Sequence, residues 1–279
     1  MVNIAVVVSF GITVLLELLF PLIVAAWMIK KHRLAWRVFG FGVLFFILVQ
    51  IPHTPLVLAI QGPLFAALNT LLGDRILSLA VFSIVLGLLA GLFEEIGRYV
   101  VFTRFFPRKK ILLSRENGLL FGAGWGGIES MIIGVLVFLS MVSYLVAVPL
   151  TEEAIHQINQ SVGGTLTEEQ IAMLKTQNEA LLHLTPFDPL IGLAERLMTF
   201  PIQIALTLLV LASVVQKRPL LLVLAILWHT ILDALVVFLA QTAGINAAEG
   251  IVAGTFLLSL VFIWRSRMGP PMHAPETGI

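Results

Sequence analysis

Two adjacent carboxylates and one guanidinium stand inside an apolar run that is long enough to cross a membrane. Glu94, Glu95 and Arg98 lie within residues 76–102, where the other side chains are mostly apolar. An ionised side chain at mid-bilayer costs roughly 2.5–3.5 kcal/mol on insertion scales, so such groups need partners, water or a function. The i,i+3 and i,i+4 spacings put Arg98 on the same helix face as both acids. The segment predicts a functional centre or, alternatively, a structural ion pair whose arginine snorkels to the interface.

Three later apolar segments carry polar groups that could join this centre. The first also has a small residue at every fourth position from Gly118 to Gly134, which predicts close helix packing by van der Waals contact. In the third, a histidine and an aspartate are four residues apart, so both can face one cavity or simply fix each other by hydrogen bonding. In chain order the polar groups are Trp125 and Glu129, then Glu195, Arg196 and Gln203, and then His229 and Asp233.

Composition places these residues in a polytopic membrane protein. Of the 279 residues, 59% are hydrophobic and 12% charged, and the mean hydropathy is +1.02. A soluble domain carries about 25% charged residues. The net charge of +1 gives no indication of nucleic-acid binding, and the absence of cysteine excludes disulfides, thiol nucleophiles and Cys-ligated metals.

The fold class that follows is an all-α bundle of about seven transmembrane helices. The expected spans are about 4–29, 35–60, 76–105, 117–148, 189–215, 219–241 and 246–264. Basic residues cluster after the first, third, fifth and seventh spans, whereas only Arg75 and Lys175 fall on the opposite side. The positive-inside rule therefore predicts an N-terminus outside and a cytoplasmic C-terminus in a prokaryotic plasma membrane.

One domain is expected over residues 1–267. An acidic outer loop at 149–186 contains Thr167-Glu-Glu-Gln170, a capping-box pattern that predicts a short solvated or interfacial helix. The last residues, 268–279, are rich in Pro and Gly and are expected to be disordered.

Depth along the helices predicts that the polar groups share one layer. At about 1.5 Å per residue from the basic end of each span, they lie about 12–21 Å deep. Scattered structural pairs would not need to agree in depth, so a shared polar cavity is predicted. His53 falls nearer the outer surface and is left out. The residues assigned to the layer are Glu94, Trp125, Glu129, Gln203, His229 and Asp233, with Glu17 at a similar depth.

Several catalytic arrangements are missing from the sequence. There is no His-Glu-x-x-His for a zinc helix and no Gly-x-Gly-Asp for a membrane aspartyl protease. What remains is a carboxylate that can activate water, with His229 and Asp233 placed to polarise a carbonyl.

The order of these motifs resembles a known family. An EExxR motif, Gly-x-Gly-x-Gly-Gly-x-Glu129, Glu195-Arg196 and His229-x-x-x-Asp233 follow one another as in YhfC-type intramembrane metalloproteases, which are similar to the CAAX-prenyl-protease and bacteriocin-processing (CPBP) group. The resemblance covers about 76–240. It implies a peptidase in which Glu94 activates water, with Glu95, His229 and Asp233 as the other catalytic residues. The supporting residues would be Arg98, Glu129, Trp125, Gln203, Glu195 and Arg196.

The resemblance also raises the question of a metal. Such families usually offer histidines where this chain has Trp125 and Gln203. A zinc ion is implied by the resemblance, with Glu94, Glu129 and His229 as weak candidate ligands, although catalytic zinc usually has three protein ligands including histidines.

The leading interpretation is an intramembrane endopeptidase acting on a membrane-embedded or lipid-adjacent peptide in the lipid bilayer. The alternatives are a catalytically inactive relative that binds a membrane peptide or partner, and a proton-coupled transporter. No nucleic-acid partner is expected, and the sequence leaves the oligomeric state open.

Overall fold

The computed structural model describes residues 2–147, 150–162 and 165–266, and it is helical in the way that the sequence predicts. Seven helices in the described part are long and apolar enough to span a membrane. They are α1 (Ile4–His32), α2 (Trp36–Leu72), α3 (Arg75–Val100) with its continuation, α5 (Arg115–Val146), α8 (Phe187–Val215), α9 (Pro219–Thr242) and α10 (Ile245–Arg265). The predicted tail at 268–279 lies outside the described residues.

The remaining helical elements are short. α3 continues through a π-helical turn, η1 (Val101–Phe105), into α4 (Phe106–Arg108). The predicted outer loop holds two helices, α6 (Glu152–Val162) and α7 (Glu168–Leu182). The capping box is confirmed: Thr167 accepts from the backbone N–H of Gln170, whose side chain accepts from the N–H of Thr167. No pattern in the sequence of the outer loop indicated α6.

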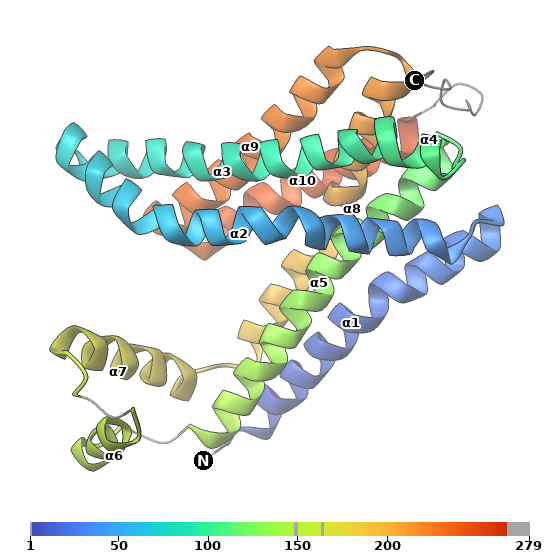
Figure 1. Ribbon diagram of the computed structural model, residues 1–279. Helices are drawn as coiled ribbons and strands as arrows, with labels where there is room; N and C mark the ends of the chain where they lie inside the picture. The colour runs from blue at the N-terminus through green and yellow to red at the C-terminus, as the bar shows by residue number, and fades with distance from the viewer. Residues whose placement is uncertain (1, 148–149, 163–164, 267–279) are drawn as a thin grey trace. The chain divides into compact units, whose positions relative to one another are not determined.

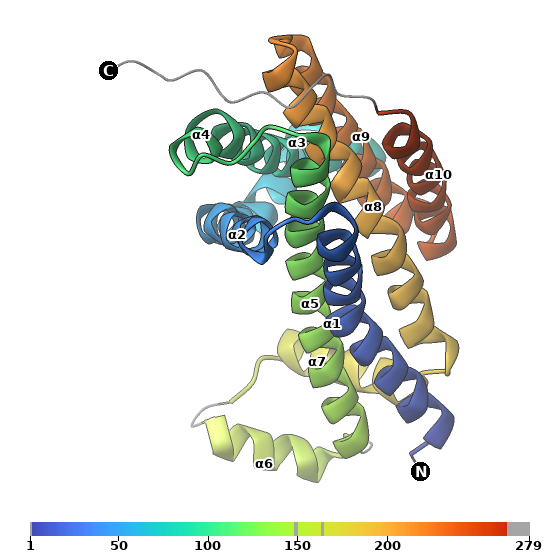
Figure 2. The same ribbon diagram turned by 90° about the vertical axis from the view of Figure 1, so that its right-hand side faces the viewer.

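The chain forms two compact units. The first consists of Met1–Leu18 and Met131–Ala194, and the second of Leu19–Ser130 and Glu195–Ile279. In the first unit, the N-terminal part of α1 lies beside the end of α5 (Figures 1 and 2), where the Phe10 and Tyr144 rings are 6.0 Å apart. Thr13 Oγ1 donates to the carbonyl of Pro189 at 3.0 Å. The buried Glu17 also belongs to this unit and lies beside Gly134.

In the second unit, α3 packs against α9 through glycines. A Cβ at Gly87 would meet the carbonyl oxygen of Thr230 at 2.5 Å, and one at Gly91 would meet that of Ile226 at 2.9 Å. Because neither glycine has a side chain, the two backbones approach closely, which is the packing that small residues allow in membranes. This contact brings the motif on α3 next to His229 and Asp233 on α9.

The ridge of small residues on α5 is also confirmed as a packing surface. Within the second unit, Gly122 faces Ile204 and Thr207, and Gly126 faces the side chain of Gln203. All three partners belong to α8. The ridge therefore holds α8 close to α5 and sets Gln203 near the polar groups of α5.

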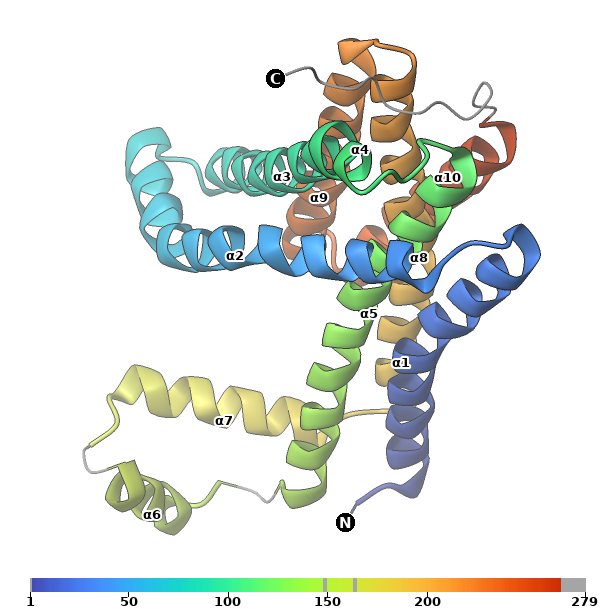
Figure 3. The ribbon, with the colours of Figure 1, turned by 45° about the vertical axis from the view of Figure 1, so that its right-hand side comes forward.

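The helix α2 is longer than predicted. The expected span ended near residue 60, but α2 continues to Leu72 through Pro52, Pro55 and Pro63. Figure 3 shows that it bends toward its C-terminal end. Proline removes a backbone hydrogen bond and bends a helix without ending it when neighbouring groups compensate.

Two glycines of the second unit provide a matched test of this packing. A Cβ at Gly124 would collide with the backbone oxygen of Phe39 on α2, whereas one at Gly40 would meet nothing within 4 Å. We expect Gly124→Ala to lower stability in detergent by about 1–3 kcal/mol through overpacking. Gly40→Ala should leave it unchanged or raise it by up to about 1 kcal/mol. Thermal unfolding measures both, and equal shifts would contradict the close α2–α5 contact.

Candidate active site

The two carboxylates of α3 are paired with Arg98 as their spacing predicts. Arg98 Nη2 lies 3.1 Å from Glu94 Oε2, and Nη1 donates to Glu95 Oε1. The side chains of Arg98 and Glu95 have no exposed surface, and Glu94 is 6% exposed. The alternative of an arginine that snorkels to the interface is therefore wrong, because the guanidinium is buried among its partners.

Arg98 also binds residues from two other helices. Its Nη2 donates to the side-chain oxygen of Gln203 on α8. Its guanidinium lies over the ring of Trp125 on α5, 4.5 Å from the centroid, which is a favourable cation–π position. Trp125 Nε1 in turn donates to Glu94 Oε2 at 2.9 Å. One buried cation thus joins three helices.

The network continues to the acid on α5. Gln203 Nε2 donates to Glu129 Oε2 at 2.8 Å, and Arg196 Nη1 lies 3.0 Å from Glu129 Oε1. Arg196 also pairs with the neighbouring Glu195, as the sequence suggested. The pair on α8 is therefore connected to the centre through Glu129.

The histidine on α9 lies between two carboxylates. His229 Nδ1 is 2.7 Å from Glu95 Oε1, and Nε2 is 3.5 Å from Asp233 Oδ2. His229 and Glu95 are buried, but the side chain of Asp233 is 37% exposed. The geometry thus sets a buried imidazole beside a carboxylate that is partly exposed at the surface of the described helices.

The structure brings the polar groups of the second unit into contact with one another, and their common depth in the membrane and the shared cavity stay predictions. Direct contacts connect Glu94, Glu95, Trp125 and Gln203 through Arg98, and His229 through Glu95. The polar groups form a packed hydrogen-bond network from α3, α5, α8 and α9. Their catalytic roles remain predictions.

Two residues of α2, Gln50 and His53, lie near Glu94 although the sequence did not indicate them. Gln50 Nε2 donates to Glu94 Oε1 at 3.2 Å, and Gln50 Oε1 lies 2.9 Å from His53 Nδ1. His53 is also in electrostatic range of Glu94, Asp233 and His229. Because Gln50 presents its oxygen, Nδ1 of His53 must donate, which leaves the lone pair on Nε2.

The sequence places His53 outside the predicted layer because depth is counted along the helix. At about 1.5 Å per residue, the 37 residues of α2 measure roughly 55 Å, nearly twice the hydrocarbon thickness of about 30 Å. Such a helix must tilt or bend, so the path along it overstates depth in the membrane. The i,i+3 spacing of Gln50 and His53 was the signal that could have linked them.

The donor set does not fit a catalytic zinc. In the part of the chain that the structure describes, no three His, Asp or Glu side chains are grouped closely enough to hold a metal ion. The three weak candidates have other partners: Glu94 binds Arg98 and Trp125, Glu129 binds Arg196 and Gln203, and His229 faces Glu95 and Asp233. The cation beside Glu94 is thus Arg98, and the cation beside Glu129 is Arg196.

Comparison with known proteins identifies the family. The family model of the YhfC intramembrane metalloproteases matches residues 16–255. The chain belongs to the YhfC family. The match extends beyond the resemblance of about 76–240 at both ends.

A bacterial relative agrees with this assignment. The YhfC chain is 31% identical over 273 residues to the "Uncharacterized membrane protein YhfC" of Bacillus subtilis (strain 168), covering 96% of this chain and 98% of the relative. No solved structure matches it. With seven apolar helices in its described part, this member of the family is a multi-pass prokaryotic membrane protein.

The charge network predicts a strong dependence of stability on Arg98. Replacing it by Met leaves Glu94 and Glu95 buried without their cation, which costs about 3–5 kcal/mol. Adding Glu95→Gln should recover part of the loss, because an uncharged amide is cheaper to bury than an unpaired carboxylate. Thermal unfolding in detergent compares the stability of the unmodified protein, the Arg98→Met variant and the double variant that also carries Glu95→Gln.

Arg104→Met is the matched control, since Arg104 is exposed near the end of the same helix. It should shift the midpoint by much less than Arg98→Met. Equal shifts of the two variants, or no recovery in the double variant, would contradict the central role of the Arg98 ion pairs.

Proposed function

We propose that this YhfC-family chain is a membrane-embedded peptidase in which His229 and Asp233 hold the attacking water. The observation that carries the proposal is the 3.5 Å separation of His229 Nε2 and Asp233 Oδ2, beside a carboxylate that is 37% exposed. The family's description as intramembrane metalloproteases supports the reaction class. In this proposal, side chains of the protein activate the water and transfer its proton.

Glu95 would act by orienting the imidazole. Its Oε1 lies 2.7 Å from His229 Nδ1, and the carboxylate is fully buried. When Nδ1 carries its proton toward Glu95, Nε2 presents its lone pair toward Asp233. A water lying to one side of this pair can donate one hydrogen to Nε2 and the other to the carboxylate, which aligns its oxygen for attack.

The proposed step is general acid–base catalysis. The water oxygen bonds to the carbonyl carbon of the peptide while its proton passes to Nε2 of His229. Nε2 then gives this proton to the leaving nitrogen as the carbon–nitrogen bond breaks. His53, whose Nε2 is buried with no hydrogen-bond partner among the described residues, is a second imidazole in electrostatic range of Asp233.

The contacts of Glu94 favour a role as the general base less than the resemblance implies. Its oxygens accept from Gln50, Trp125 and Arg98, which occupies about three of its four acceptor positions. Its side chain is 7% exposed. We therefore assign Glu94 to holding Arg98 and Trp125 in place, and we assign the water to the more open Asp233.

An inactive relative that binds a membrane peptide is the second candidate. Trp125 and Gln203 stand where the resemblance expects histidines, and both have hydrogen-bonding roles around Arg98. A binding protein would need this rigid network but no turnover.

Substitutions of the water-holding pair test the peptidase. We expect His229→Gln and Asp233→Asn to lower the rate at least about a hundredfold, the lower end for losing general acid–base catalysis. Glu94→Gln should lower it less at equal protein stability. The measurement is mass spectrometry of new peptide termini in membranes of cells that express each variant at matched levels.

Arg37→Gln is the control, since Arg37 is exposed in the first turn of α2. Unchanged cleavage by His229→Gln would refute the assignment of the base. If Glu94→Gln alone abolished cleavage, the general base would be Glu94. The absence of any new termini with the unmodified protein would favour the binding protein.

A further inference from the structure

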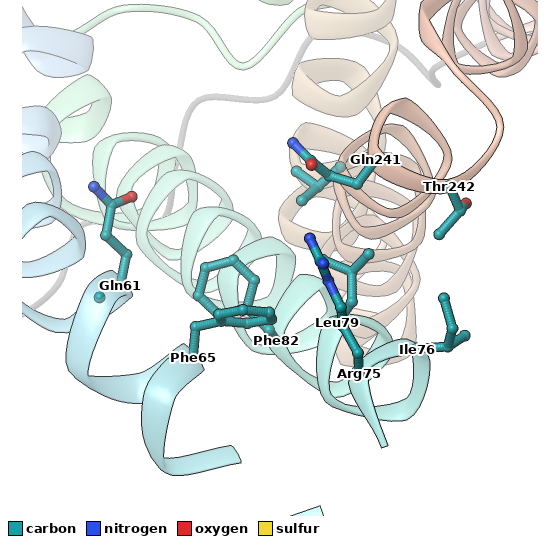
Figure 4. A pocket seen from close by; sticks show the side chains of 10 residues that line it. Gln61, Phe65, Arg75, Ile76, Leu79, Phe82, Gln241 and Thr242 are labelled. Carbon is teal, nitrogen blue, oxygen red and sulfur yellow. The ribbon is translucent and has the colours of Figure 1, made fainter. Parts of the chain in front are cut away.

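A pocket lies on α2, α3 and α9, three of the helices that contribute to the candidate active site, but nearer their ends. It has a volume of about 660 Å³ and is formed by the C-terminal part of α2, the first turns of α3 and the end of α9. Figure 4 shows Arg75 extending into it, with Phe65 and Phe82 beside the arginine and Gln241 beyond its guanidinium. This volume is within the usual range for small-ligand sites.

Arg75 is the one charged side chain in the lining of this pocket. Among the described residues it forms no ion pair or hydrogen bond with another side chain. The nearest acid in the sequence, Asp74, is used as the N-cap of α3 and accepts from the backbone N–H of Leu77 at 2.8 Å. The pocket therefore presents an uncompensated positive charge.

The lining of the pocket is polar at one end and apolar at the other. Arg75 begins α3, and Gln241 and Thr242 end α9, so all three lie where membrane-spanning helices terminate. The rings of Phe65 and Phe82 pack edge to face, 5.4 Å apart, and Leu79 and Val237 complete the apolar part. Val237 and Gln241 are about 6 Å and 12 Å from Asp233 along α9.

This arrangement fits an amphiphile better than a wholly polar ligand. An anionic head would pair with Arg75 at the membrane boundary, and its chain would lie against the phenyl rings and aliphatic side chains. Several lining residues, among them Ile76, are exposed to the surroundings of the helices, so such a molecule can enter sideways from the bilayer. Arginine forms strong, directional hydrogen bonds with phosphate oxygens.

We propose that this pocket binds one anionic phospholipid, with its phosphate on Arg75 and an acyl chain between α2, α3 and α9. The proposal is independent of peptidase activity, since it uses none of the residues around Arg98. Neither a free inorganic anion nor an acidic peptide would use both the charge and the apolar wall in this way.

The test compares phosphatidylglycerol with phosphatidylcholine of identical chains. Native mass spectrometry of the purified full-length protein in detergent measures the affinity for each lipid. We expect the unmodified protein to prefer phosphatidylglycerol about fivefold, the factor that one basic residue near an anionic headgroup supplies. Arg75→Gln should reduce this ratio to about one, whereas Arg75→Lys should retain most of it.

Two further variants keep the test decisive. Val237→Trp fills the apolar part without removing the charge, and it should weaken phosphatidylglycerol binding while the midpoint of thermal unfolding stays within a few degrees. Arg37→Gln, which removes an exposed arginine at the start of α2, should leave the lipid preference unchanged.

Three results would overturn the proposal. The first is a preference for phosphatidylglycerol that survives Arg75→Gln. The second is competition by inorganic phosphate at concentrations comparable with the lipid, which would show that the charge alone is bound. The third is displacement of the lipid by a short acidic peptide but not by a second anionic lipid, which would assign the pocket to a peptide.

Discussion

The cost of placing charge in a low-dielectric interior is the constraint on which the second unit depends. Arg98 is buried completely, and it would be strongly destabilising without partners. Glu94 and Glu95 supply the compensating charge from its own helix, while Gln203 and the ring of Trp125 supply a hydrogen-bond acceptor and a π face from two others. The guanidinium suits this position because its planar fork can bind several acceptors at once.

The packing of small residues makes this arrangement accessible. Gln203 reaches Arg98 because α8 lies close to the glycine ridge of α5, where a Cβ at Gly126 would meet Gln203 itself at 2.9 Å. His229 reaches Glu95 because Gly87 and Gly91 let α3 approach α9. Van der Waals packing in the membrane and the polar network are thus two aspects of the same helix contacts.

The network also separates a rigid part from an accessible part. Arg98, Glu95 and Trp125 are buried, and each has more than one contact. Arg98 contacts both of the others, Glu95 also contacts His229, and Trp125 also donates to Glu94. Asp233 lies at the margin, with a single imidazole contact and partial exposure. Buried, over-determined groups orient neighbours well, whereas a reacting water needs an open carboxylate. This division is the basis for assigning positioning to Glu95 and Glu94 and the water to His229 and Asp233.

The sequence alone determined the membrane class, the helices and most of the candidate site. Hydropathy set the seven spans, and i,i+3 and i,i+4 spacing predicted the Arg98 pairs and the His229–Asp233 pair, because both signals are local and depend only on helix geometry. Tertiary structure decided the rest. That Arg98 is buried rather than snorkelling depends on two neighbouring helices, α5 and α8. That His53 lies near Gln50 and Glu94 depends on the bend and length of α2. The structure also explains why Trp125 and Gln203 can stand where the resemblance expects histidines. Both side chains contact the guanidinium of Arg98. These features arise from contacts between distant segments, and no local pattern encodes them.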